Sequence, residues 1–535
     1  MTLARCLMVQ GTASGVGKSV LATALCRVLY EEGFRVAPFK AQNMSLNAAV
    51  TEEGGEIGRA QAVQAQAASV APSVRMNPIL LKPEADNRSQ LVVLGKATGE
   101  YATKDYWRKP NPLWPIVSGA LDQLRREFEI VVIEGAGSPA ELNLRRVDIA
   151  NMRVATEAEA GVILVGDIER GGIFAQLLGT LDLLPRSERD RVRALVVNKF
   201  RGDASLFDDG VRILHERTNL PVFVLPFVDD LGVPSEDALA AENAQPAPDA
   251  PEIAAIAYPH VSNHDDLEPL AAAGARVRYV RHPADLDRPD LIVLPGSKTT
   301  LADLAWLRRR GIAQRICTLA NRGTPVIGIC GGFQMLGREL RDATGTDGSS
   351  GAVPGLALLP VETTFQRHKR TALVHVRVVT PGFLGGADDL VFDAYEIHVG
   401  QTRREPGVRP FAELVTYSSR RSRSDGAVSA DGLIVGTYAH GLFADGGLRN
   451  ALLTALARRS GRAFIPRDPP ADPYGRVSRW LRGSIDVPDL LARCGVTRDL
   501  SGSPRTGAAA AGDEHVGRGT LPSLEFGSLR GNGAI

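Results

Sequence analysis

Gly11-Thr12-Ala13-Ser14-Gly15-Val16-Gly17-Lys18-Ser19 is the stretch that decides the fold of the first half of this sequence. The apolar run Leu3–Gln10 precedes it, and the helical pattern Val20–Tyr30 follows it. Glycines in a turn from strand to helix let backbone N–H groups surround phosphate oxygens, and the helix dipole adds positive potential there. We expect a nucleoside triphosphate in this loop, with Lys18 at its β- and γ-phosphates and the Ser19 hydroxyl on Mg²⁺.

The sequence around this loop has the pattern of an α/β fold. Over residues 1–240, apolar runs alternate with helical patterns, which is typical of a parallel sheet covered by helices on both faces. The runs that we expect to be buried strands, besides Leu3–Gln10, are Ile130–Ile133, Gly161–Val165 and Leu195–Val197. Because such doubly wound sheets bind ligands at the carboxyl ends of their strands, polar residues after these runs are candidates for the site.

Three polar residues occupy such positions. Lys40 follows the run Arg35–Phe39 and could stabilise charge on a transferring phosphoryl group, or it could be an ordinary surface lysine. Glu134 follows another run, where a carboxylate can bind Mg²⁺. Asn198 could read a purine base, and Arg201 stands where the NKxD motif of GTPases has aspartate, which favours ATP over GTP. The residues expected to bind nucleotide are Gly11, Thr12, Gly15, Val16, Gly17, Lys18, Ser19, Lys40 and Asn198.

The form GTxxGVGKS is one residue longer than the plain phosphate-loop pattern, and it resembles the loop of dethiobiotin synthetase and its relatives. These enzymes activate carboxylates. The resemblance implies that Ser19, Glu134 and Glu56 bind Mg²⁺, since Glu56, five residues before Gln61, matches an acidic ligand of that family in spacing. An acid at the start of a helix is also favourable through the dipole alone, so Glu56 has two interpretations.

A second loop, Gly328-Ile329-Cys330-Gly331-Gly332-Phe333-Gln334, has the form of a nucleophile elbow. The apolar run Val326–Ile329 precedes it, and the helical pattern Phe333–Leu340 follows. Flanking glycines permit the strained turn that projects a nucleophile from the top of a sheet. A helix N-terminus also favours the reactive thiolate form of a cysteine, so we predict that Cys330 is a nucleophile rather than a buried structural cysteine.

A cysteine nucleophile needs a base and an oxyanion site. His440 follows the apolar run Leu433–Tyr438 and is the predicted base. Leu294-Pro295-Gly296-Ser297-Lys298 is another turn after a strand. The residues predicted to form the oxyanion and glutamine site are Gly296, Ser297 and Gly331, with Gln334 holding the elbow or the amide substrate.

The elbow, the Pro-Gly turn and the late histidine together resemble the triad-type, class I glutamine amidotransferase domain, whose fold is flavodoxin-like. That family usually has glutamate two residues after the histidine, but this chain has Leu442. Either another acid orients His440, or the site works as a dyad. Tyr395-Glu396-Ile397-His398 offers a rival histidine and acid, but it precedes the final strand, so we favour His440.

Composition excludes several classes of function. The 535 residues carry a net charge of +1, and aromatic residues make up 5%. We therefore expect neither a nucleic-acid nor a membrane partner. The five cysteines form no CxxC pair, the N-terminus has no signal-peptide pattern, and no apolar run reaches the ~18 residues that span a bilayer. These features predict a cytoplasmic protein.

Changes of pattern along the chain predict its domains. Residues 1–240 would form the nucleotide domain, and residues 253–455 the amidotransferase domain, with an Ala- and Pro-rich linker at 241–252. Residues 456–500 would form a C-terminal helical segment, and residues 501–535 a disordered tail. The expected fold is thus α/β, with two doubly wound, mostly parallel-sheet domains.

This order of domains resembles the cobyric acid synthases of cobalamin biosynthesis over roughly residues 5–480. The most specific stretches are Phe39-Lys40-Ala41-Gln42-Asn43-Met44-Ser45 and Asn198-Lys199-Phe200-Arg201-Gly202-Asp203. The resemblance implies amidation of the b, d, e and g carboxylates of adenosylcobyrinic acid a,c-diamide. Its substrates would be the corrinoid, glutamine and ATP, with Mg²⁺ as cofactor.

Two alternatives remain at this point. One is amidation of a different carboxylate, either the a and c positions of cobyrinic acid or a cell-wall intermediate. The other is a P-loop partitioning ATPase, which would give no reason for Cys330 and His440. The sequence does not indicate the oligomeric state.

Overall fold

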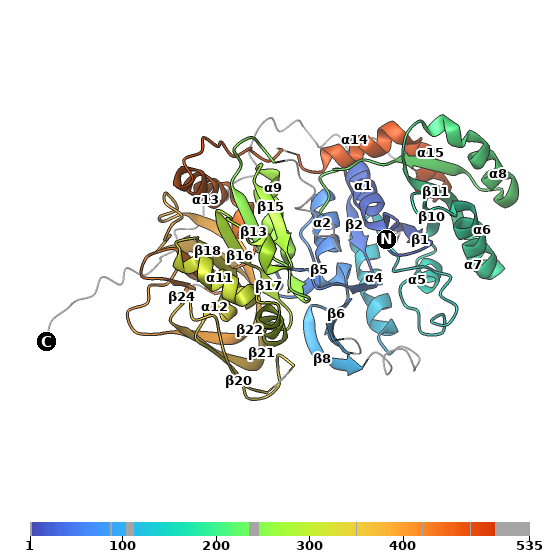
Figure 1. Ribbon diagram of the computed structural model, residues 1–535. Coiled ribbons are helices and arrows are strands. Elements are labelled where there is room, and N and C mark those ends of the chain that lie inside the picture. Colours follow the sequence, from blue (N-terminus) through green and yellow to red (C-terminus); the bar gives the residue numbers. More distant parts are fainter. Residues whose placement is uncertain are drawn as a thin grey trace.

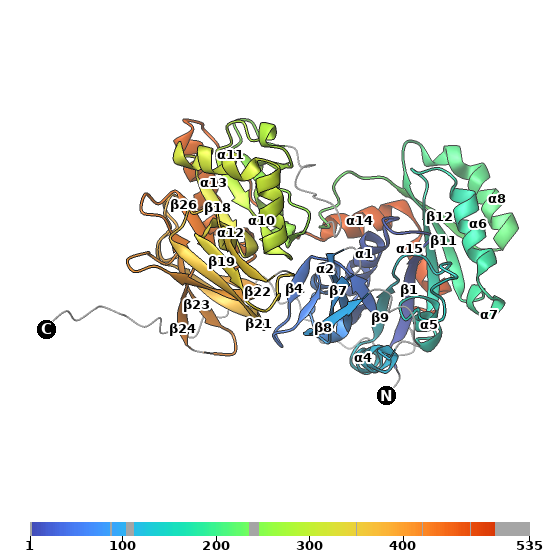
Figure 2. The ribbon, with the colours of Figure 1, turned by 60° about the horizontal axis from the view of Figure 1, so that its bottom comes forward.

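The computed structural model describes residues 3–85, 88–102, 112–234, 246–348, 350–419, 421–470 and 472–497. They form two α/β halves that lie side by side (Figure 1; Figure 2 gives a second view). The predicted disordered tail and residues 241–245 of the predicted linker fall outside these ranges. Within the ranges, no helix combines the length and the apolar character needed to span a membrane.

The first half is built on a six-stranded parallel sheet in the order β12-β11-β10-β1-β9-β2. Its strands are β1 (Arg5–Gly11), β2 (Val36–Phe39), β9 (Ile130–Glu134), β10 (Gly161–Asp167), β11 (Val192–Phe200) and β12 (Val222–Pro226). Successive residues of β1 face opposite sides, so that Leu7 packs into one core and Met8 into the other. Helices cover both faces, as predicted for a doubly wound sheet. They are α1 (Lys18–Glu31) on the first face, and α4 (Trp114–Glu127), α5 (Met152–Glu157), α6 (Ile173–Leu183) and α8 (Asp208–Thr218) on the second.

The chain between β2 and α4 forms a small layer that faces the second half. It contains α2 (Arg59–Ala67), the hairpin β4 (Ala48–Val50) and β5 (Glu56–Gly58), and a sheet of β3 (Gln42–Met44), β6 (Ile79–Ala85), β7 (Arg88–Val93) and β8 (Lys96–Ala102). Ala48 and Val50 pack with Tyr395 and Ile397 of the second half in one apolar cluster. This layer is therefore the contact between the halves.

The second half contains a sheet in the order β15-β13-β16-β18-β26, whose neighbours are all parallel, with β25 added antiparallel at the edge. The strands are β13 (Glu252–Ile256), β15 (Arg276–Val280), β16 (Leu291–Leu294), β18 (Val326–Ile329), β25 (Ala427–Val428) and β26 (Ile434–Thr437). Counted along the chain, the parallel strands run 2-1-3-4-5, which is the flavodoxin-like order and confirms the predicted fold. Its helices are α9 (Glu268–Ala272), α10 (Thr300–Arg309), α11 (Ile312–Asn321), α12 (Gly331–Leu336) and α13 (Gly446–Arg459).

A further, largely antiparallel sheet was not anticipated from the sequence. Its strands are β19 (Glu339–Asp342), β20 (Gly351–Pro354), β21 (Val361–Val378), β22 (Val391–Arg404), β23 (Ala412–Thr416) and β24 (Ser422–Asp425). The long β21–β22 pair brings Lys369 and Tyr395 to the first half. The predicted helix Phe333–Leu340 is also shorter, because the chain enters β19 at Glu339.

The predicted C-terminal helical segment, residues 456–500, belongs to both halves. Helix α13 ends at Arg459 on the second half, whereas α14 (Gly475–Ser484) and α15 (Val487–Arg493) cross back and pack on the first (Figure 1). Leu481 and Leu490 are fully buried in the core that contains α1. The first domain is thus completed by residues far from it in sequence.

We predict that Leu481→Ala lowers the free energy of unfolding of the first half by about 2–5 kcal/mol, because it removes a buried leucine and leaves a cavity. Denaturant unfolding of the full chain, followed by nucleotide binding, measures the change. Arg479→Ala on the exposed face of the same helix is the control, with a change within about 0.5 kcal/mol. Equal effects of both variants would contradict this packing.

Candidate active sites and the family of the chain

The phosphate loop connects β1 to α1, as the sequence predicts. Gly15 and Gly17 have φ of 73° and 101°, in the left-handed region that favours glycine. The Lys18 ammonium donates hydrogen bonds to the carbonyl oxygens of Ala13, at 2.8 Å, and Gly137, at 3.0 Å. Lys18 therefore lies across the loop, between the two strand ends β1 and β9.

Glu134, at the end of β9, is the buried centre of this site. Its Oε1 accepts hydrogen bonds from Ser19 Oγ, at 2.9 Å, and Lys40 Nζ, at 2.8 Å, and its Oε2 accepts one from Gln64 Nε2, at 2.6 Å. Burial alone would raise the pKa of this carboxyl, but Lys40 and the hydrogen bonds lower it below its ordinary value. The structure thus brings together Ser19, Lys40 and Glu134, and it adds Gln64, which the sequence reasoning missed. Gln64 is buried on α2 together with Gln61, and the sequence pattern gave no signal that separates the two glutamines.

The Ser19 hydroxyl and the Glu134 carboxylate fit a Mg²⁺ site. Mg²⁺ in nucleotide sites takes one or two carboxylates and keeps substrate phosphates and waters as its other ligands. Ser19 and Glu134 lie at hydrogen-bond distance from each other beside the phosphate loop. In the described part of the chain, no cluster of three or more His, Cys, Asp or Glu offers an all-protein metal site.

Glu56 forms two ion pairs, and its predicted role as a Mg²⁺ ligand stays a prediction. Its Oε2 pairs with Lys82 Nζ at 2.8 Å, and its Oε1 pairs with Lys369 of the second half. Burial would raise the pKa of Glu56, but the two ammonium groups lower it to about 2. One oxygen thus pairs within the first half, and the other pairs with Lys369 of the second half, more than three hundred residues away in sequence.

Asn198 supports the phosphate loop. Its side-chain amide donates to Val16 O at 2.8 Å and lies directly against Gly17, where a Cβ would overlap it. The neighbouring Lys199 donates to Gly15 O, at 2.9 Å, and pairs with Asp167, at 2.9 Å. These contacts fix the loop from the β11 side, and the predicted reading of a purine base by Asn198 stays a prediction.

Cys330 lies in a strained turn between β18 and α12. Its φ of 53° and ψ of −109° are rare for a residue with a side chain, which is the geometry expected of a nucleophile elbow. A Cβ at Gly332 would overlap the carbonyl of Leu294, so the turn requires glycine there. The thiol lies 3.4 Å from Ile397 O of β22.

His440 is paired with Asp266, which supplies the acid that the sequence reasoning could not find. His440 Nδ1 lies 2.7 Å from Asp266 Oδ2, and both side chains are 1% exposed. Burial would lower the pKa of His440, but Asp266 and hydrogen bonds to Asp266 and the Cys330 thiol raise it to about 10. The Gly441 N–H also donates to Asp266 Oδ1 at 2.6 Å. Cys330, His440 and Asp266 therefore have the arrangement of a triad.

The rival histidine lies in different surroundings. His398 stacks on the Tyr438 ring with centroids 3.8 Å apart, and its Nδ1 contacts Gly400 O at 3.1 Å. Glu396 is held by Arg370, at 3.0 Å, and by Arg423. Among the contacts of the described residues, none joins His398 to Cys330, and this favours His440 as the base.

The predicted oxyanion residues lie together beside Cys330. A Cβ on Gly331 would lie 2.8 Å from Ser297 N, and one on Gly296 would lie 3.0 Å from His440 Cε1. Gln334 Nε2 donates to Val399 O at 2.9 Å, and its Oε1 accepts from Thr300 Oγ1 at 3.1 Å. Gln334 thus ties the elbow to β22 and α10.

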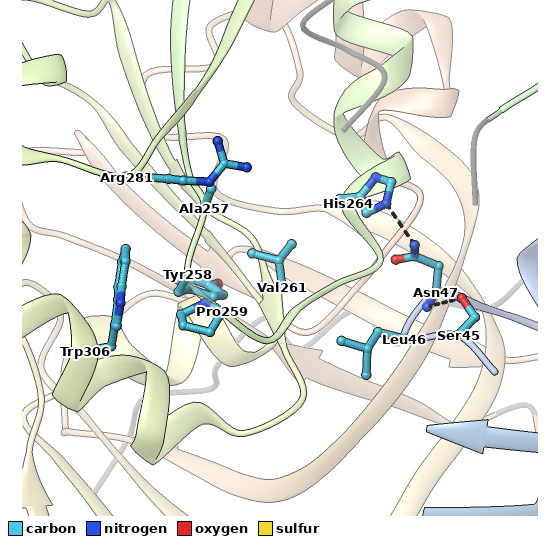
Figure 3. A pocket seen from close by; sticks show the side chains of 10 residues that line it. All are labelled: Ser45, Leu46, Asn47, Ala257, Tyr258, Pro259, Val261, His264, Arg281 and Trp306. Carbon is cyan, nitrogen blue, oxygen red and sulfur yellow. Dashed lines mark hydrogen bonds between the residues drawn. The ribbon is translucent and has the colours of Figure 1, made fainter. Parts of the chain in front are cut away.

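A cavity of about 440 Å³ lies where the two halves meet (Figure 3). It is bounded by Ser45, Leu46 and Asn47 of the first half and by Ala257, Tyr258, Pro259, Val261, His264, Arg281 and Trp306 of the second. Asn47 Nδ2 and His264 Nε2 are 2.8 Å apart across the boundary, and the dashed line in Figure 3 marks this bond. The cavity thus borders the residues just before Asp266.

Comparison with known proteins assigns each half of the chain to a domain family. Residues 7–238 match the CobQ/CobB/MinD/ParA nucleotide binding domain, and residues 252–447 match the CobB/CobQ-like glutamine amidotransferase domain. The chain is 43% identical over 499 residues to a cobyric acid synthase of Dehalococcoides mccartyi (strain CBDB1), covering 92% of this chain and 99% of that protein. The chain belongs to the cobyric acid synthase family.

Other members match the chain at slightly higher identity. The cobyric acid synthase of Sorangium cellulosum (strain So ce56) is 46% identical over 510 residues, which cover 90% of this chain and 96% of that protein. That of Chloroflexus aurantiacus (strain ATCC 29366 / DSM 635 / J-10-fl) is 47% identical over 491 residues, covering 91% and 98%. As a member of this family, the chain is an ATP-dependent amide ligase that uses glutamine. The predicted family and enzyme class are confirmed.

We predict that Asp266→Asn lowers kcat for glutamate release from glutamine by about 10²–10⁴-fold, because an amide no longer orients His440 or stabilises its charged form. Steady-state glutamate release measures the effect. Glu396→Gln, which alters the rival acid, is the comparison and should cost far less. The reverse result would assign the base to His398.

The His440–Asp266 pair also predicts a pH dependence of stability. The pKa of His440 is raised by folding, so the stabilisation is fully present below about 6.5 and is lost as the pH rises toward about 10. We expect the difference in unfolding free energy between wild type and Asp266→Asn to shrink between pH 6.5 and pH 10. Denaturant titrations at several pH values measure it, and a constant difference would refute the pair.

Proposed function

We propose that this chain amidates the b, d, e and g carboxylates of adenosylcobyrinic acid a,c-diamide, using four glutamines and four ATP. The observation that carries the proposal is the presence of a carboxylate-activating site around Glu134 and a glutaminase triad around Cys330 in one chain. The relatives named cobyric acid synthase match both halves together, which supports a corrinoid over a cell-wall substrate.

In the first half, a carboxylate oxygen of the corrinoid attacks the γ-phosphorus of ATP. This forms an acyl phosphate and releases ADP, which gives the carbonyl carbon a good leaving group. Lys18 and Lys40 stabilise the charge on the transferring phosphoryl group, and the backbone N–H groups of the loop bind the phosphates. Ser19 and Glu134 would hold Mg²⁺, which when bound neutralises phosphate charge.

In the second half, the Cys330 sulfur attacks the side-chain amide carbon of glutamine. The raised pKa of His440, about 10, means that the imidazole oriented by Asp266 already holds the thiol proton when the thiolate attacks, and it passes that proton to the departing nitrogen. Backbone N–H groups of the 296–297 turn and of Gly331 stabilise the oxyanion. Ammonia leaves, and water hydrolyses the thioester to glutamate. The ammonia then displaces phosphate from the acyl phosphate and forms the new amide.

We also propose that ammonia passes between the halves without mixing with solvent, where protonation would make it unreactive. The buried contact between the layer around β4 and the strand β22 supports this proposal. All five cysteines are free, which fits a reducing compartment, and we propose the cytoplasm.

Cys330→Ala should abolish glutamine-dependent amidation, since the nucleophile is lost, and should keep amidation with free ammonium at roughly wild-type rates. Glu134→Gln, which alters only the other site, should lose amidation with either nitrogen source by about 10²-fold or more. Mass spectrometry of the corrinoid product measures both.

If free ammonium fails to rescue Cys330→Ala while wild type uses glutamine, the division of labour is wrong. If wild type leaves the corrinoid unchanged with either nitrogen source, the substrate assignment is wrong.

A further inference from the structure

Four consecutive buried residues, Asn263, His264, Asp265 and Asp266, connect the first half to the catalytic histidine of the second. Asp266 binds His440, and the other three bind the first half. Asn263 Nδ2 donates to Ala48 O at 2.8 Å, the His264 ring meets the Asn47 amide at 2.8 Å, and the Asp265 carboxylate pairs with the guanidinium of Arg59 at 2.9 Å.

The partners in the first half belong to the segment that also builds the ATP site. Arg59 begins α2, and Gln64 on the same helix donates to Glu134. At 1.5 Å of rise per residue, the two backbone positions lie about 7.5 Å apart along the axis of one helix. Asn47 is tied to α2 as well, because its carbonyl accepts the Arg59 N–H at 3.2 Å. One helix therefore joins the phosphate site to the loop that carries Asp266.

We propose that Arg59 is a positioning residue for the glutaminase, whose ion pair with Asp265 holds the loop 263–266 so that Asp266 is aimed at His440. The inference deepens the proposed function, on which it rests. It implies that the triad is complete only when the first half is docked.

The charges around Arg59 explain why removing its side chain would change the position of Asp266. Asp265 is 7% exposed and lies near Glu268, another acid, whose pKa burial and Asp265 raise to about 7. The positive charge of Arg59 opposes this effect and lowers the pKa of Glu268. A buried carboxylate that loses its cation lowers its free energy by moving toward water. Because Asp265 is the chain neighbour of Asp266, such a movement would displace Asp266 as well.

Asn263, at the start of the loop 263–266, also links Asp266 to the first half. Asn263, which precedes the short helix His264–Leu267, has a φ of 53°, in the left-handed region that asparagine adopts more readily than most other residues with a side chain. Its amide bonds to Ala48 O and to the Tyr395 hydroxyl at 2.9 Å, and the Tyr395 ring stacks on His440 with centroids 5.3 Å apart. The start of the loop is thus held both by Ala48 of the first half and by Tyr395 of its own half.

The test compares Arg59→Gln, Asp265→Asn, the double variant and Arg59→Lys, each as the full chain. Glutamate release and ammonium-dependent amidation of the corrinoid are measured for each. We expect both single variants to lose about 10- to 100-fold in kcat for glutamate release, with ammonium-dependent amidation kept within about twofold. The double variant should lose no more than either single variant, since both break one pair, and Arg59→Lys should recover most of the rate.

Gln90→Ala is the matched control, because it removes a different bond between the halves, from Lys369 Nζ at 3.2 Å, without touching the loop. Both of its activities should stay within about twofold of wild type. The inference is overturned if Asp265→Asn keeps full glutamate release, if the two losses multiply in the double variant, or if Arg59→Gln loses both activities equally. Glutamate release needs no corrinoid, so a wrong substrate assignment would leave this measurement decisive.

Discussion

The contact between the His440 imidazole and the Asp266 carboxylate, 2.7 Å long and almost wholly buried, is the constraint on which the second half depends. Burying a carboxylate is costly unless charge and hydrogen bonds offset it. Here a histidine whose pKa is raised to about 10 supplies the charge, and the Gly441 N–H supplies a hydrogen bond. The elbow and the oxyanion turn then place Cys330 and the N–H donors around the same imidazole.

The first half also buries a carboxylate and offsets the cost of its burial with a cation and hydrogen bonds. Glu134 is buried at the end of β9, and the Lys40 ammonium and two uncharged donors satisfy it. In both sites a buried carboxylate is surrounded by a cationic side chain and hydrogen-bond donors, and it orients a group that takes part in the chemistry. The sites are joined through α2, which contacts Glu134 at Gln64 and the loop of Asp266 at Arg59.

The sequence was most informative where function depends on strand ends. Lys40, Glu134 and the phosphate loop were predicted to share a site because each follows a strand of the parallel sheet. Cys330 was predicted to be a nucleophile because glycines flank it in a turn from strand to helix. Asp266 could not be found by spacing, since it reaches His440 from 174 residues away through packing of the whole domain. The ion pair of Glu56 with Lys369 could not be found by spacing either. Lys369 lies on β21, a strand of the largely antiparallel sheet that was not anticipated from the sequence. Buried and exposed residues do not alternate regularly along this strand, so its sequence has no clear strand periodicity.

We propose that the second half supplies the nitrogen that the first half installs. Wild-type enzyme given corrinoid, ATP and glutamine labelled with nitrogen-15 at its side-chain amide, in a buffer that contains unlabelled ammonium, tests it directly by mass spectrometry of the product. We predict that the new amides carry the heavy isotope. New amides that carry mainly nitrogen from the buffer would contradict it.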